Sequence, residues 1–140
     1  MNDIRIDVKK DEVPILESIL CGQKRGNGEP WTLHGLISAW MGFVCHVSRG
    51  YELTIDDYCN DLACRDALQE VIDGCPQRLQ TEIERIVKPF DQRFYEATRE
   101  IGKPLIGWRL FGGDKQWRRR IPLMLKEELE RDLSSLGYIE

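Results

Sequence analysis

The chain has 140 residues and a net charge of −4 at pH 7, with 41% hydrophobic and 31% charged residues. This length predicts one helical domain, residues 1–140, with enough apolar side chains to form a core without disulfides or metals. The amino-terminal residues contain no apolar run long enough for a secretory signal, and no other stretch indicates a membrane protein, so we expect a cytoplasmic location.

Five cysteines are spread along the chain: Cys21, Cys45, Cys59, Cys64 and Cys75. An odd number of cysteines without a secretory signal is typical of reduced thiols. No two of them form a CxxC pair, so the sequence predicts no zinc site, and it indicates no other metal or cofactor.

The first predicted elements are short. Apolar and charged residues alternate within residues 3–9, which predicts a half-buried strand if a partner strand exists. Residues 11–21 predict a short helix, and the three glycines and one proline of residues 22–30 predict a loop.

Two longer helices follow. Residues 32–49 form the most apolar segment of the chain, with Thr32 as a candidate N-cap and Gly50 as a candidate end. Residues 54–73 predict a second helix, whose threonine and aspartate at its start approximate a capping box. We expect the first of these to be the central, buried helix of the fold.

The central segment also carries small residues at helical spacing. Gly35, Ala39 and Gly42 fall at positions i, i+4 and i+7, so they would form a smooth stripe against which another helix can pack closely. That helix could belong to the same chain or to a second copy, so a homodimer is one possibility.

Residues 76–101 have the clearest amphipathic periodicity. Pro89 removes a hydrogen bond to the Arg85 carbonyl, so the segment is either one kinked helix or two helices that meet there. Residues 122–136 predict a last helix, with its leucines, including Leu136, facing the core.

These elements predict a mainly α fold, a compact bundle of four to six helices around residues 32–49. Residues 105–111 and 117–121 alternate on either side of a glycine-rich turn, which is compatible with a β-hairpin. A small hairpin or short sheet built from these two segments and residues 3–9 is therefore possible.

The helix over residues 54–73 is strongly acidic. Residues 51–74 contain seven acidic side chains and one arginine. One interpretation is a solvated face, and the other is a surface for a basic partner protein. In the second case, the carboxylates that would face the partner are Asp57, Asp61, Asp66 and Glu70.

A basic, aromatic segment follows at residues 104–126, with six basic side chains and one acidic side chain, so the rest of the chain carries a net charge of −9. Its candidate partner-binding residues are Trp108, Trp117, Arg118, Arg119 and Arg120. Three interpretations are open: contacts with nucleic-acid phosphates and bases, a protein interface anchored by tryptophan and arginine, or internal pairing with the acidic helix.

A third constellation involves His34 and Cys45, which lie about three turns apart on one face of the central segment. A thiol- or metal-dependent site there would need further ligands, such as Cys59 or Cys64. The alternative is that this face belongs to the core. No nucleophile–base pair or metal motif is complete in the sequence, which favours a non-enzymatic protein but leaves an enzyme open as an alternative.

The favoured hypothesis is a small protein-binding module of the inhibitor, immunity or antitoxin type, which uses the acidic helical face. Complementary charge speeds the encounter with a basic protein partner and contributes to specificity. The first alternative is nucleic-acid or nucleotide binding through residues 108–120. The second is an enzyme around His34 and Cys45.

Overall fold

The computed structural model describes residues 5–23, 29–105 and 115–140, which form five α-helices, one 3-10 helix and a two-stranded antiparallel sheet. Along the chain the elements are α1 (Val13–Cys21), α2 (Leu33–Arg49), α3 (Ile55–Gly74), α4 (Gln77–Glu96), β1 (Thr98–Glu100), the 3-10 helix η1 (Gln116–Arg119), β2 (Arg120–Pro122) and α5 (Glu127–Ser135). The mainly helical fold with a small sheet is confirmed. None of the described helices is both long and apolar enough to cross a bilayer.

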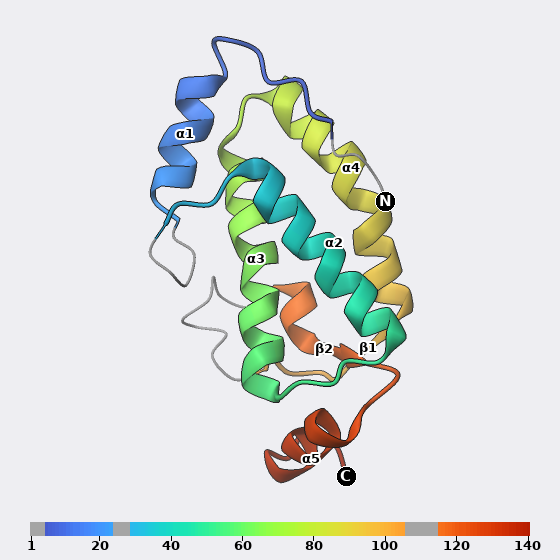
Figure 1. The fold of residues 1–140 in the computed structure, drawn as a ribbon. Coiled ribbons are helices and arrows are strands. Elements are labelled where there is room, and N and C mark those ends of the chain that lie inside the picture. Colours follow the sequence, from blue (N-terminus) through green and yellow to red (C-terminus); the bar gives the residue numbers. More distant parts are fainter. Residues whose placement is uncertain (1–4, 24–28, 106–114) are drawn as a thin grey trace.

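The three long helices α2, α3 and α4 pack on one another, with α1 against α3 and with α5 beside the beginning of α3 (Figure 1). Helix α2 packs on α3 and α4, while α3 also contacts α1, α5 and η1. The residues that α2 buries in the core are Leu33, Leu36, Ile37, Trp40, Phe43, Val44 and Val47. These positions recur every three or four residues, so they lie on one face of α2, and this face is buried in the core.

The helix ends follow local sequence signals. The Thr32 hydroxyl accepts a hydrogen bond from the Gly35 amide at 2.9 Å, and Thr54 and Asp57 form a reciprocal capping box at the start of α3. At the end of α5, Gly137 has a φ of 81°, and the Tyr138 amide donates to the Leu133 carbonyl at 2.9 Å. This Schellman arrangement needs a residue that tolerates positive φ, which glycine does.

The segment over residues 76–101 is one helix followed by a strand. Pro89 lies inside α4, and both Pro89 and Arg85 are exposed, so the carbonyl that loses its hydrogen bond is on the solvent side. The helix ends at Glu96, five residues before the predicted end at Ile101, because the following backbone pairs with β2.

The sheet differs from the predicted one. Strand β1 pairs with β2 in the register Arg99↔Ile121, whereas residues 116–119 are 3-10 helical and residues 106–114 lie outside the described part of the chain. Residues 5–9 form no strand, since no neighbouring strand pairs with them, although Ile6 and Val8 pack against the core.

Two further predictions are wrong. The last helix begins at Glu127 rather than at Pro122, because residues 120–122 belong to β2. Its last leucine, Leu136, is 47% exposed instead of facing the core.

The small-residue stripe is open at Gly42. A Cβ atom added at Gly42 would meet no heavy atom within 4 Å, and the residue is exposed. No helix from the described part of the chain therefore packs over this position, since the core contacts of α2 lie on its other side.

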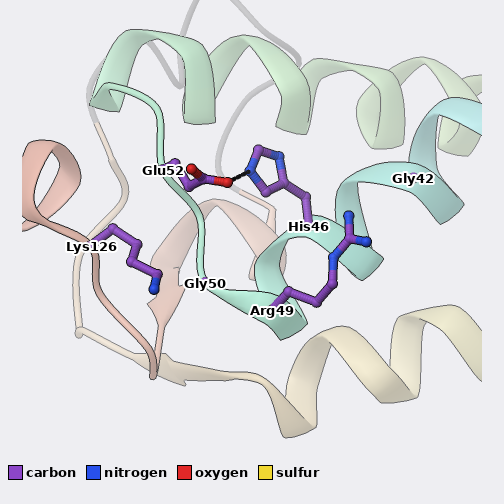
Figure 2. Close-up of a pocket in the computed structure, with 6 residues that line it drawn as sticks. All are labelled: Gly42, His46, Arg49, Gly50, Glu52 and Lys126. Atoms are coloured by element: carbon purple, nitrogen blue, oxygen red, sulfur yellow. Dashed lines mark ion pairs between the residues drawn. The ribbon is translucent and has the colours of Figure 1, made fainter.

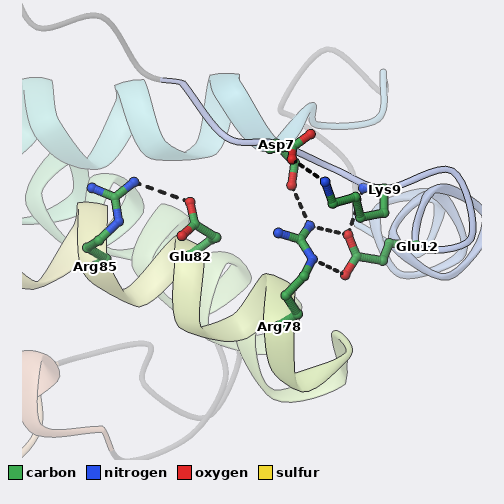
Figure 3. A network of polar contacts seen from close by, with 6 residues as sticks. All are labelled: Asp7, Lys9, Glu12, Arg78, Glu82 and Arg85. Carbon is green, nitrogen blue, oxygen red and sulfur yellow. Dashed lines mark hydrogen bonds and ion pairs between the residues drawn. The ribbon is translucent and has the colours of Figure 1, made fainter.

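The segment that precedes α1 is held by Arg78 of α4 (Figure 3). The Arg78 guanidinium donates to both carboxylate oxygens of Glu12 and to the Asp7 carbonyl. Glu12 is only 4% exposed and also accepts a hydrogen bond from the Lys9 amide at 2.7 Å. The hydrogen bonds from Arg78 lower the pKa of Glu12 below its usual value.

Because the pKa of Glu12 is lower in the folded protein, its contribution to stability is present above about pH 4.5 and is lost as the pH falls through the folded pKa. Glu12→Gln is expected to lower the melting temperature at pH 7. The difference in melting temperature between this variant and wild type is expected to shrink as the pH falls towards 3. Thermal unfolding between pH 3 and pH 7 checks this, with the exposed Glu17→Gln as the matched control. An equal loss at every pH would contradict the linkage.

Candidate functional site

The four predicted carboxylates of α3 lie on two sides of the helix. Asp57 and Asp61 are one turn apart, and so are Asp66 and Glu70, but the two pairs are separated by about two and a half turns, counted from Asp57 to Asp66. The first pair lies towards the loop after α2, and the second towards η1 and the end of α1. The structure therefore does not bring the four together into one strip.

Asp57 is exposed and is engaged in the capping box, whereas Asp61 is half-buried. The hydroxyl of the fully buried Tyr51 donates to Asp61 at 2.5 Å. Burial raises the pKa of both groups, and the carboxylate also raises the pKa of Tyr51. The phenol therefore stays protonated, and Asp61 accepts the hydrogen bond of its buried hydroxyl group.

Asp66 forms a buried ion pair with Arg118. The guanidinium of Arg118 is fully buried and donates to Asp66 and, at 3.0 Å, to the Cys59 carbonyl. The indole of Trp117 donates to the other oxygen of Asp66 at 2.7 Å. Burial raises the pKa of Asp66, and the hydrogen bonds from Arg118 oppose that effect. These side chains thus contact one another inside the protein.

A second buried arginine extends this network. Arg65 of α3 donates to both oxygens of Asp91 of α4, at 2.9 and 2.8 Å, and the Trp40 indole donates to the same carboxylate. The guanidinium of Arg65 also lies over the Trp117 ring, 4.6 Å from its centroid. The network therefore joins α2, α3, α4 and η1. The ion pair between Arg65 and Asp91 was not predicted from the sequence.

The other described arginines of the basic segment also bind the protein's own groups. Arg119 donates to the Gly102 carbonyl at 3.2 Å, and Arg120 donates to Thr98 and to the Tyr95 carbonyl at the end of α4. Trp108 lies outside the described residues. In the described part of the segment, the contacts match the internal interpretation, in which the arginines pair with the body of the domain.

Glu70 is exposed and accepts a hydrogen bond from the side-chain amide of Gln23 at 2.8 Å. Gln23 also donates to the Ala67 carbonyl, so the residues that follow α1 are tied to α3 here. Of the four predicted carboxylates, Asp57 and Glu70 are therefore accessible, and they lie on opposite sides of the helix.

A different set of carboxylates lies in the first turns of α3 and α5, and we call it the acidic end. Its members are Asp56, Asp57, Glu127, Glu128 and Glu130, all exposed. The two helices are in contact, because the Ile55 backbone amide at the start of α3 donates to Asp132 in the second half of α5 at 3.0 Å. The positive ends of two helix dipoles explain why acidic residues are stable at this place.

Most carboxylates of the acidic end lack a cation. Arg131 lies 3.2 Å from Glu127 and 3.9 Å from Glu128, but Asp56 and Glu130 form no ion pair within the described ranges. The predicted partner-binding residues include acids of α3 but none of the acids of α5. The three glutamates at positions 127, 128 and 130 were the available signal.

Apolar side chains are exposed beside the acidic end. Among the described residues, four of the six exposed large hydrophobic side chains lie on or next to the segments that meet there: Leu53, Leu123, Met124 and Leu136. Exposed apolar side chains with a charged rim are the usual composition of a protein-binding surface.

The third predicted constellation is dispersed. His34 is exposed and Cys45 is half-buried, so this face of α2 is at the surface and not in the core. Cys45 lies 3.7 Å from an Arg93 nitrogen, while burial raises the pKa of Cys59 to about 11 and that of Cys64 to about 12. The described ranges contain no cluster of three or more histidine, cysteine or acidic side chains that could hold a metal.

Comparisons with protein-family models, with curated proteins and with solved structures gave no match.

Proposed function

We propose that this protein is a protein-binding module of the inhibitor, immunity or antitoxin type, and that it binds a basic partner protein through the acidic end. The observation that carries the proposal is the coincidence of unpaired carboxylates with exposed leucine and methionine side chains at one end of the molecule. Apolar contacts would supply affinity, and the carboxylates would steer the partner and select it by charge.

The proposed contact surface differs from the surface predicted from the sequence. Asp57 remains part of it, but Asp61 and Asp66 have hydrogen-bond partners within the domain, so they are not proposed as partner contacts. Glu70 lies near the other end of α3, beside Gln23, so a partner on the acidic end would not contact it.

The basic alternative has less support from the described residues. Trp117 and Arg118 contact Asp66, and Arg120 contacts the end of α4, so these side chains do not form an open basic face. A net charge of −4 also disfavours binding to a nucleic-acid backbone.

Charge reversal tests the proposal. The double variant Asp56→Lys/Glu130→Lys changes two exposed carboxylates without breaking an ion pair between described residues. It is expected to slow association with a partner purified from the host by at least about tenfold at low salt and to flatten the salt dependence. Stopped-flow association at several ionic strengths measures both quantities.

The control variant is Glu17→Lys/Glu84→Lys, which makes the same change in net charge at exposed positions of α1 and α4. It is expected to alter the association rate far less than the acidic-end variant does. Equal slowing by both variants would mean that only net charge matters and that the acidic end is not the binding surface.

A further inference from the structure

The two cations of the pocket at the end of α2 do not meet at one point (Figure 2). Arg49 and Lys126 lie on opposite sides of Gly50. The His46–Glu52 pair lies between the two cations, with 3.9 Å from His46 Nε2 to Glu52 Oε1. Gly50 has a φ of 104°, and a Cβ atom there would lie 2.5 Å from Cε of Lys126, so another residue would displace this side chain. Cations that point apart in this way cannot hold one anionic group together.

A groove between α3 and α4 is built differently. Its volume is about 290 Å³, at the lower end of the range of small-molecule sites. Ile72 and Val87, each 2% exposed, contribute apolar surface to it. The charged and polar residues that line it recur every three or four positions on each helix, so they form one row on α3 and one on α4. These rows include Arg65, Gln69, Asp73, Glu84, Lys88 and Asp91.

The row on α3 is held together by its own hydrogen bonds. Arg65 Nη1 donates to Gln69 Oε1 at 3.0 Å, and Gln69 Nε2 donates to Asp73 Oδ1 at 2.9 Å. Arg65 also forms an ion pair with Asp91 of α4 at 2.8 Å, so one strong contact spans the groove. The row on α3 is therefore an ordered wall with a guanidinium at one end and a carboxylate at the other.

The ion pair between Arg65 and Asp91 also shows which residues of the two helices lie at the same level. The helices run in opposite directions, because only a short turn separates the end of α3 from the start of α4 (Figure 1). Asp73 is about 12 Å from Arg65 along α3, and Glu84 is about 10 Å from Asp91 in the same direction. Lys88 is only about 4 Å from the level of Asp91. The groove therefore has a carboxylate end, with Asp73 and Glu84, and a cationic end, with Lys88.

The charges at the two ends are available to a ligand. Asp73, Glu84 and Lys88 are exposed, and none of them forms an ion pair with another residue in the ranges that the structure describes. Arg65 and Asp91 neutralise each other, so they add no free charge. Along the helix axes, Lys88 is separated from the two carboxylates by about 6–8 Å. A ligand that satisfies both ends needs a positive and a negative group at about this separation.

We propose that this groove binds a small linear zwitterion, an ω-amino acid whose ammonium and carboxylate groups are joined by a short methylene chain. The ammonium group binds at Asp73 and Glu84, and the carboxylate group binds at Lys88. The methylene chain lies on the apolar surface between them. In extended 5-aminopentanoate the nitrogen and the carboxyl carbon are about 6 Å apart, which matches the two ends. The groove involves the last turns of α3 and not the first, so this inference is independent of the acidic end.

An NMR titration of the isotope-labelled full chain with 5-aminopentanoate, pentanoate and pentylamine tests the proposal. Saturable shifts of amide signals along α3 and α4 are expected with 5-aminopentanoate. Its Kd is expected to be at least about tenfold lower than those of the two singly charged compounds, because each of these leaves one end of the groove unpaired. Lys88→Gln and Asp73→Asn are each expected to raise the Kd of 5-aminopentanoate about tenfold.

Lys10→Gln and Asp11→Asn are the matched controls, at exposed positions outside the groove, and they should leave the affinity unchanged. Lys88 and Asp73 are exposed, so their variants are expected to stay folded, and melting temperatures measured in parallel check this. Three results would each overturn the proposal: no saturable shift up to about 10 mM 5-aminopentanoate, equal affinity for pentanoate or pentylamine, or an affinity that Lys88→Gln leaves unchanged.

Discussion

Asp66→Asn is expected to lower the free energy of unfolding by about 3–5 kcal/mol and the melting temperature by roughly 10 °C or more. The reason is the fully buried Arg118 guanidinium, which would lose its counter-charge and cannot give up its proton. Denaturant unfolding measures the loss. Asp73→Asn, at an exposed carboxylate of the same helix, is expected to cost far less.

The reverse replacement separates charge from packing. Arg118→Met leaves Asp66, whose pKa burial already raises, and this carboxyl can take up a proton. Arg118→Met is therefore expected to be less destabilising than Asp66→Asn. If both variants unfolded at the wild-type denaturant concentration, the ion pair would not contribute to the stability of the fold.

Phe43→Ala is expected to lower the free energy of unfolding by about 3–5 kcal/mol. Phe43 lies at the centre of an aromatic cluster, with ring centroids 5.3–6.0 Å from those of Trp40, Tyr51, Tyr58 and Phe94. Removing its ring leaves a cavity between side chains from three helices and a loop, and rigid aromatic neighbours cannot easily fill it.

Phe90→Ala is the matched control for this prediction, because it deletes the same group from a half-buried position of α4. Its expected cost is smaller, since water and neighbouring side chains can occupy the space. Equal losses for the two variants in denaturant unfolding would contradict the central place of Phe43 in the core.

The sequence predicted the helices whose signals are local. Thr32 and Thr54 cap α2 and α3 as expected, because a cap depends on a few neighbouring residues. The sequence did not predict the elements whose backbone partners lie far away along the chain. Residues 98–100 continue an amphipathic pattern, yet they form β1 because their partners lie at residues 120–122. Periodicity within one segment contains no information about such a partner.

The candidate site was harder to predict than the fold. The acids of α3 look like one strip in the sequence, but the five residues from Asp61 to Asp66 carry the chain onto another side of the helix. Which side is covered depends on Arg118, more than fifty residues later. The pocket likewise needs Lys126 beside Gly50, a contact that only the packed chain creates.

Capture from the native host, with wild type and the two double charge-reversal variants in parallel, tests the acidic end most directly. The account predicts that wild type and Glu17→Lys/Glu84→Lys recover one stoichiometric protein that resists nuclease, and that Asp56→Lys/Glu130→Lys loses it. Recovery of nucleic acid that is released at moderate salt, or of the same protein by all three forms, would contradict it.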